Sequence, residues 1–272
     1  MLDTHTAHTL EVPGARLHYE LRGSGPLLAL VGAPMGGEFF VEVADRLAGE
    51  RTVLTYDPRG ISRSVLTAPA VTDTPELRAD DVRRLVAAAR TDGPVDVFGS
   101  SGGAVTGLAL VQAHPGLLRT LVAHEPPVTE LLPDAADQHA FRDRLERTFA
   151  ERGPDAAMLE FMAGIGVDPS GMDLSAIPEA ALAEMRANNN YFFGHQLRGT
   201  TEFVPDVAVL RAASTRVVIG VGTTNPEQIT QRTSAALAEL LGEPTVPFPG
   251  DHGGFIGEPA AFADRLREVL AG

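Results

Sequence analysis

Ser101 stands at the centre of the run GSSGG (residues 99–103), which fits the pattern G-x-S-x-G. The apolar segment VDVFGS (95–100) before it is typical of a buried strand, and GAVTGLALVQAH (103–114) after it is typical of a helix. A sharp turn between strand and helix exposes the serine hydroxyl, and the flanking glycines let the chain segments pass without a Cβ clash. The amino-terminal end of the helix adds partial positive charge. The pattern therefore predicts that Ser101 is a nucleophile.

Two other interpretations of this glycine-rich turn stay open. It could have no chemical role, or it could bind phosphate. The phosphate interpretation has less support, because the sequence contains neither the lysine of a P-loop nor the pattern G-x-G-x-x-G. The strand before Ser101 and the helix after it favour catalysis.

The elements that would position this serine follow from an alternation along most of the chain. Short apolar runs predict strands, and segments with apolar residues at helical spacing predict helices. Strands alternating with helices indicate an α/β fold, with a mostly parallel central sheet covered by helices on both faces. The expected strands are 16–23, 27–33, 51–58, 95–100, 118–126, 216–222 and 244–250, and the expected helices are 38–49, 74–89, 103–114, 226–242 and 258–272.

Residues 127–207 interrupt this alternation. They contain helical pieces at 141–152, 155–166 and 179–193, with no convincing strand between them. We therefore predict a helical cap, or lid, over residues 127–207. It would be inserted between a first core part, 1–126, and a second, 208–272.

The chain carries the segments LVGAPMGG (30–37), YDPRGISRS (56–64), VFGSSGG (97–103) and GDHGGF (250–255), in that order. These four segments resemble the α/β-hydrolase superfamily, in which they occur in the same order. They are similar to its oxyanion loop, its strand-four segment, its nucleophile turn and its histidine loop. The resemblance extends over essentially the whole chain and implies the α/β-hydrolase fold and a hydrolytic enzyme. The HEPP run (124–127) and the histidine loop are also similar to a generic group of actinobacterial hydrolases.

The resemblance implies a role for His252, which lies on a glycine-flanked loop after the last expected strand. An imidazole there would take the proton from the serine and return it to the leaving group. The oxyanion hole would use the backbone amides of Gly102 and Ala33. Asp57 and Arg59 are interpreted as structural residues near the turn.

The third member of a catalytic triad is harder to assign. The superfamily usually has an aspartate close to the position of Asn225, and an amide carries no charge to stabilise an imidazolium. Glu125 closes the expected strand beside the nucleophile strand, and some members, such as haloalkane dehalogenases, take their acid from this strand end. We predict Glu125 as the acid, with Asn225 as the alternative or as a hydrogen-bonding neighbour. Glu227 and Asp251 are weaker candidates.

These residues predict hydrolysis of a carboxylic ester, lactone or thioester of a small apolar substrate through an acyl-enzyme. They imply no metal and no organic cofactor. Two alternatives stay open: a cofactor-free haloperoxidase or perhydrolase, and a non-hydrolytic ligand-binding protein or natural-product cyclase. Apolar residues proposed for the pocket are Met35, Phe39, Met158, Phe161, Met162, Tyr191 and Phe192.

Composition limits the partners. The 272 residues are 44% apolar, which is enough for one sizeable core. The absence of cysteine excludes disulfides, and a net charge of −14 disfavours nucleic acid. No apolar run is long enough to span a bilayer, and the first residues lack a secretory pattern. We expect a cytoplasmic protein that binds a small-molecule substrate; the sequence leaves a homodimer open.

Overall fold

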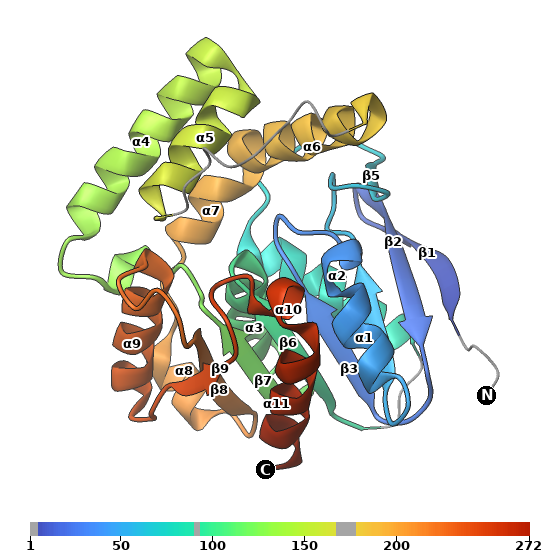
Figure 1. Ribbon diagram of the computed structural model, residues 1–272. Coiled ribbons are helices and arrows are strands. Elements are labelled where there is room, and N and C mark those ends of the chain that lie inside the picture. Colours follow the sequence, from blue (N-terminus) through green and yellow to red (C-terminus); the bar gives the residue numbers. More distant parts are fainter. Residues whose placement is uncertain (1–4, 90–92, 167–177) are drawn as a thin grey trace.

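A nine-stranded sheet lies at the centre of the protein (Figure 1). The computed structural model describes residues 5–89, 93–166 and 178–272. Along the sheet the strand order is β1-β2-β4-β3-β6-β7-β8-β9, and β5 pairs with β2. The strands are β1 (Thr6–Val12), β2 (Ala15–Arg22), β3 (Leu27–Val31), β4 (Thr52–Tyr56), β5 (Val65–Leu66), β6 (Val95–Ser100), β7 (Leu118–His124), β8 (Arg216–Gly222) and β9 (Val246–Phe248).

Strand direction divides the sheet into two parts. From β4 through β3, β6, β7 and β8 to β9, every neighbouring pair is parallel. β2 is antiparallel to β1, β4 and β5. Every residue of β3 and β6 is buried, as expected of parallel strands that helices cover on both faces. In a parallel sheet the carboxyl ends meet at one edge, so the residues that follow β6, β7 and β8 are brought together.

Helices cover both faces of this sheet, and each face has its own hydrophobic core. In the described parts of the chain, no helix is long and apolar enough to cross a membrane. One face is covered by α2 (Pro75–Ala88), α3 (Gly102–Ala113), α8 (Val207–Ala212) and α9 (Ile229–Leu241); the other is covered by α1 (Val41–Leu47), α10 (Gly254–Gly257) and α11 (Pro259–Ala271).

The start of α2 illustrates how local sequence determines a helix. The hydroxyl of Thr74 accepts a hydrogen bond from the backbone N–H of Leu77, which caps the first turn. Pro75 occupies the first helical position, where its missing N–H has no cost. Val82 and Leu85 then lie on the buried face.

A second group of helices, which we call the helical layer, lies above the sheet in Figure 1. It has its own small core, centred on Leu145, Phe192 and Phe193. A π-helical turn interrupts the long helix that runs from α6 into α7. The helical layer consists of α4 (Ala135–Arg152), α5 (Pro154–Gly164), α6 (Glu179–Tyr191), the π-helical segment Phe192–Gln196 and α7 (Leu197–Thr201).

The predicted fold class, with its mostly parallel sheet and helices on both faces, is confirmed. Several elements were not predicted: β1, β5, α8 and α10. β1 has no alternating pattern of buried apolar residues: six of its seven residues are exposed or half-buried, along a free edge of the sheet. Its pairing with β2 is what forms the strand. The division into 1–126, 127–207 and 208–272 stays a prediction, and residues 167–177 of the predicted cap lie outside the described residues.

The boundaries of three predicted helices were also wrong. Helix 141–152 begins earlier, at Ala135. Helix 38–49 begins as a 3₁₀ turn, Gly37–Phe40, and becomes α-helical only over Val41–Leu47. Helix 226–242 begins at Ile229, because the preceding residues form a turn in which Gln228 N–H bonds to the Asn225 carbonyl.

Candidate active site

Ser101 occupies a strained turn between β6 and α3. Its φ of 56° and ψ of −124° are unusual for a residue with a side chain, and such strain persists only where neighbouring contacts hold it. The Ser101 N–H donates to the carbonyl of His124 at 2.9 Å, which ties the turn to β7. A Cβ on Gly103 would lie 2.0 Å from the Val31 carbonyl oxygen, so this position requires glycine. The turn therefore holds the serine at the carboxyl edge of the sheet.

His252 follows β9 and lies beside the carboxylate of Glu125. The distance between His252 Nδ1 and Glu125 Oε2 is 2.6 Å, although 127 residues separate the two in sequence. His252 and Ser101 both line one cavity, and the histidine side chain is 27% exposed. The structure thus brings Glu125 to His252 and places Ser101 and His252 at the same cavity.

Glu125 is held rigidly at the end of β7. It is fully buried, with a positive φ of 50°. Its Oε1 accepts from the Gly222 N–H at 2.8 Å, and its Oε2 accepts from the Thr230 hydroxyl at 2.7 Å as well as facing His252. Thr230, in the first turn of α9, has a role that the sequence analysis missed, because nothing local to α9 indicates a carboxylate partner.

The protonation state of Glu125 follows from these contacts. Burial by itself raises the pKa of this carboxyl, because desolvation disfavours the charged form. The hydrogen bond and charge of His252, with a smaller effect from the Thr230 hydroxyl, more than offset burial and lower the pKa of Glu125 to about 2. Glu125 is therefore an ionised hydrogen-bond acceptor at neutral pH.

The other acid candidates lie elsewhere. Asn225 is exposed on the turn after β8, and it borders a groove beside the cavity without lining the cavity itself. Among the described residues, no hydrogen bond joins Asn225 to His252. Asp251 accepts from the backbone N–H of Gly253 at 2.9 Å, which orders the histidine loop. Glu227 is exposed on the same turn as Asn225.

Ala33 and Gly102, predicted for the oxyanion hole, are both buried and both line the cavity beside Ser101. A Cβ on Gly102 would lie 2.7 Å from the Ala33 carbonyl oxygen, so the two segments are in close contact. Gly102 is the first residue of α3, where backbone N–H groups have no acceptor within the helix. The segment that carries Ala33 thus lies against the first residue of α3.

Asp57 and Arg59 are engaged in ion pairs outside the cavity. Asp57 accepts from the Gly37 N–H at 2.8 Å and from Arg63 Nε at 2.7 Å. Arg59 donates two hydrogen bonds to Asp81, at 2.8 and 2.7 Å. These contacts agree with the structural interpretation of both residues.

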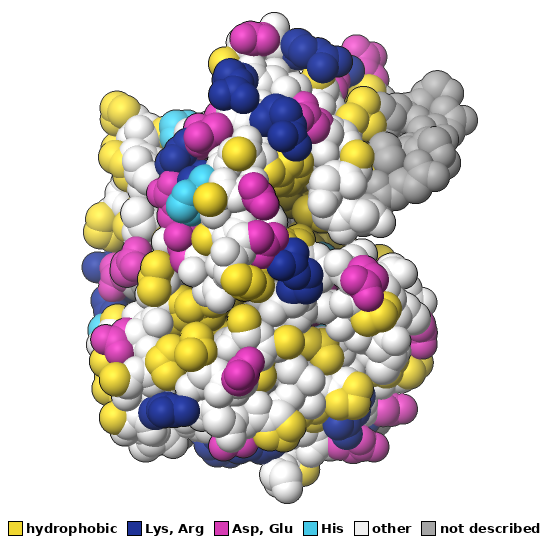
Figure 2. Space-filling view, turned by 90° about the vertical axis from the view of Figure 1, so that its left-hand side faces the viewer, with side chains coloured by type: hydrophobic (Ala, Val, Ile, Leu, Met, Phe, Trp, Pro, Cys, Tyr) yellow, Lys and Arg dark blue, Asp and Glu magenta, His cyan; other side chains and the backbone are white. Residues whose placement is uncertain are grey.

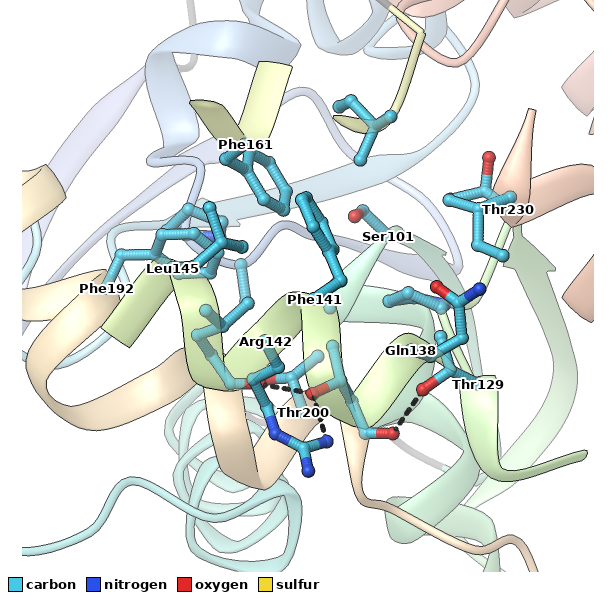
Figure 3. Close-up of a pocket in the computed structure, with 18 of the residues that line it drawn as sticks. Ser101, Thr129, Gln138, Phe141, Arg142, Leu145, Phe161, Phe192, Thr200 and Thr230 are labelled. Carbon is cyan, nitrogen blue, oxygen red and sulfur yellow. Dashed lines mark hydrogen bonds between the residues drawn. The ribbon is translucent and has the colours of Figure 1, made fainter. Parts of the chain in front are cut away.

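The cavity next to Ser101 is mostly apolar and has a volume of about 230 Å³. Phe141 and Phe161, from the helical layer, lie across from the Ser101 hydroxyl in Figure 3. Gln138 and Thr230 lie on the other side in the same view. The residues around the cavity include Met35, Pro127, Thr129, Phe141, Leu145, Phe161, Ile165, Phe192, Leu197, Thr200, Thr201 and Ile229.

The predicted pocket residues are only partly the observed ones. Met35, Phe161 and Phe192 line the cavity. The other four do not: Phe39 is exposed, and Met158, Met162 and Tyr191 are absent from the cavity wall. The sequence analysis missed Phe141 and Leu145, although their spacing of four residues places them on one face of α4. The face of a helix that meets the site depends on packing that periodicity alone does not determine.

A hollow separates the helical layer from the body of the molecule on the face that Figure 2 shows, with hydrophobic side chains inside it. Arg142 borders the cavity, but its Nη2 pairs with Glu202 at 2.8 Å, so its charge is compensated. Within residues 5–89, 93–166 and 178–272, no group of three or more histidine, aspartate or glutamate side chains could hold a metal ion.

His124, the last residue of β7, lies beneath the site in an aromatic box. Its ring centroid is 6.3 Å from that of His252, and the ring planes are 24° apart. Its Nδ1 is 3.4 Å from Ser100 Oγ, and its buried Nε2 has no partner among the described residues. Burial lowers the pKa of His124 to about 3, and the neighbouring Glu125 opposes this shift. The box consists of Phe98, Phe248, Phe255 and Phe262.

We expect His124→Phe to make the protein less sensitive to acid. The unfolded chain takes up a proton at His124 below its ordinary pKa of 6.5, whereas the folded protein does so only near 3. Stability from this group is complete above pH 6.5 and is lost as the pH falls toward 3. The stability gap between variant and wild type should change by about 1 kcal/mol per pH unit below pH 6.

Urea unfolding of both proteins at pH 7, 6 and 5 measures this difference. Glu125 does not contribute to the pH dependence of stability over that range. Its pKa is lowered on folding from 4.5 to about 2, so the stability that it provides is lost only below pH 4.5. His114→Gln, which replaces a half-buried histidine at the end of α3 and outside the aromatic box, is the control. Equal slopes for His124→Phe and wild type would contradict the prediction.

Comparison with known proteins identifies the class. The family model described as the alpha/beta hydrolase family matches residues 27–265. The chain is 33% identical over 270 residues to an uncharacterized hydrolase, YraK, of Bacillus subtilis (strain 168), over 96% of this chain and 95% of the relative. The chain therefore belongs to the alpha/beta hydrolase family, and it is an enzyme of the hydrolase class.

Solved structures with the same fold include a thermophilic esterase from Thermogutta terrifontis, with a TM-score of 0.74, 20% identity and coverage of 98% of each chain. An alpha/beta hydrolase from Sphaerobacter thermophilus DSM 20745 has a TM-score of 0.67 and 24% identity, covering 97% of this chain and 98% of its own. At these identities the likeness shows the fold alone.

Proposed function

We propose that this protein hydrolyses small apolar carboxylic esters, including lactones and thioesters, through an acyl-enzyme on Ser101. One observation carries the proposal. Ser101 and His252 line the same apolar cavity, and His252 Nδ1 is hydrogen-bonded to the buried, ionised Glu125. A histidine oriented by a carboxylate in this way would activate Ser101 once its Nε2 meets the serine hydroxyl.

The reaction would proceed in two steps. With Nδ1 engaged by Glu125, Nε2 of His252 is the nitrogen free to accept the Ser101 proton as the hydroxyl attacks the substrate carbonyl. The N–H groups of Gly102 and Ala33 stabilise the oxyanion that forms. His252 then protonates the departing alcohol or thiol, which leaves the acyl group on Ser101. In the second step His252 takes a proton from a water molecule as its oxygen attacks the acyl carbon. The bond between that carbon and Ser101 Oγ then breaks, His252 returns the proton to Oγ, and the free acid leaves.

The cavity supports a small acyl group. Its volume of about 230 Å³ lies below the roughly 300–1,000 Å³ of common ligand sites. Its lining is mainly aromatic and aliphatic, with threonine hydroxyls at the edge. In this proposal the predicted cap, residues 127–207, acts as a lid that supplies the acyl-binding wall and excludes water from it.

Turnover of p-nitrophenyl acetate, butyrate and palmitate tests this function directly. We expect measurable turnover of acetate and butyrate and little of palmitate, because the cavity is too small for a long acyl chain. Intact-mass analysis after incubation with a fluorophosphonate should show one adduct per chain, at Ser101. A protein that neither hydrolyses these esters nor takes up the probe would refute the proposal and would favour a ligand-binding role.

A further inference from the structure

A buried ion pair, Asp73–Arg78, lies beneath the helical layer and takes no part in the proposed chemistry. Its arginine is hydrogen-bonded both to the helical layer and to α3. Asp73 lies just before Thr74, the residue that caps α2, and Arg78 lies within that helix; the side chains are 0% and 1% exposed. Arg78 Nη1 is 3.2 Å from Asp73 Oδ1 and also donates to the Asp73 carbonyl at 2.9 Å. Two buried charges are costly to desolvate, and fold stability is a weak explanation for keeping them.

The remaining donors of Arg78 reach two different parts of the molecule. Nη2 donates to the hydroxyl of Thr200 in α7 at 2.9 Å, and Nε donates to the hydroxyl of Thr106 in α3 at 3.0 Å. Thr106 in turn donates to the carbonyl of Gly102 at 3.0 Å. One planar guanidinium therefore connects the helical layer to the first turn of the helix that begins at Gly102.

Asp73 holds the π-helical segment of the same layer. Its second carboxylate oxygen accepts from the Gln196 amide at 2.7 Å, and its backbone N–H donates to the His195 carbonyl at 3.1 Å. A π-helical turn is intrinsically unfavourable and is often found at functional sites. In this protein the π-helical turn is held by the hydrogen bonds that Asp73 makes with Gln196 and His195.

The segment 192–201, anchored in this way, forms one wall of the cavity through Phe192, Leu197, Thr200 and Thr201. That wall meets the proposed oxyanion hole, because a Cβ on Gly102 would lie only 3.3 Å from Thr200 Cγ2. A small movement of α7 would therefore change the space above Ser101.

We propose that Asp73 and Arg78 are positioning residues that hold segment 192–201 against Gly102 and so set the size of acyl group that reaches Ser101. The part about acyl size rests on the proposed ester hydrolysis; the anchoring does not. Two other hydrogen bonds assist, from Ser62 N–H to the Asn188 side chain and from the Thr129 hydroxyl to the Thr201 carbonyl. Loss of the ion pair should loosen the segment rather than release it.

The test is the double variant D73N/R78M, which removes both charges and the guanidinium fork but leaves no unpaired buried charge. Hydrogen exchange of the amides in 192–201 should accelerate by about tenfold or more, while those of β6 and β7 keep their wild-type rates. For the hydrolytic reaction, KM for the butyrate ester should rise severalfold, and the preference for butyrate over longer esters should shrink.

A matched control is available in the buried pair Arg59–Asp81, which donates no hydrogen bond to segment 192–201 among the described residues. R59M/D81N should leave exchange in that segment unchanged. Wild-type exchange there in D73N/R78M would overturn the anchoring, and so would equal acceleration across the whole chain. Because exchange is measured without substrate, this result is independent of whether the protein hydrolyses esters.

Discussion

Ser101→Ala is expected to lower ester turnover by at least about 10⁴-fold, because alanine removes the oxygen that forms the acyl-enzyme. The cavity, Gly102, His252 and Glu125 remain in place, so substrate binding should change little. Single-turnover and steady-state rates with p-nitrophenyl butyrate measure the loss. The melting temperature, measured alongside, should stay close to that of wild type, because alanine keeps the Cβ at the strained φ of 56° and removes only the hydroxyl.

Ser100→Ala is a closely matched control. Ser100 is the preceding residue and is fully buried in β6, where its hydroxyl faces His124 rather than the cavity. We expect this variant to keep turnover within about threefold of wild type, since its lost hydrogen bond is long and outside the reaction. Ester turnover that survives Ser101→Ala would remove the serine from the mechanism and refute the proposed acyl-enzyme.

The second large effect is expected at the acid. Glu125→Gln should lower kcat by about 10³–10⁴-fold, because a neutral amide cannot stabilise the imidazolium and favours the wrong tautomer of His252. The shape of the side chain is kept, so the contacts to Gly222 and Thr230 should be weakened rather than lost. The variant should fold, and steady-state kinetics at pH 7 and 8 should show the loss mainly in kcat.

Asn225→Gly provides the comparison, since Asn225 occupies the position where the superfamily usually has its acid. Glycine suits the positive φ of 56° at this turn and removes the side chain. Near wild-type turnover is expected, because this exposed residue does not line the cavity. An active Glu125→Gln together with an inactive Asn225→Gly would transfer the role of the acid to Asn225.

Structural features that depend only on residues close together in the sequence could be predicted. GSSGG between an apolar strand and a helix marks the turn, because glycine is the only residue that fits where the Gly103 Cα approaches the Val31 carbonyl. The alternation of strands and helices predicted the parallel sheet, because burial on both faces requires continuous apolar runs such as LLALV in β3. β1 was missed since its stability comes from a partner strand and not from its own pattern.

The geometry of the site is a tertiary property. The sequence could nominate Glu125 from its place at a strand end, but only packing brings its carboxylate to His252, 127 residues away, and to the Thr230 hydroxyl. Local periodicity cannot report such contacts, because it specifies which face of an element is buried but not which distant side chain meets it. The Arg78 contacts to Thr106 and Thr200 are of the same kind.

The sequence by itself therefore determined the fold class, the strained serine turn and a short set of candidate acids and bases. The tertiary structure decided which carboxylate faces the histidine, which aromatic residues line the cavity and how the helical layer is attached above Ser101. The reason is physical. Backbone conformation follows from neighbours in sequence, whereas the direction and charge environment of a buried side chain depend on elements that meet only in the folded chain.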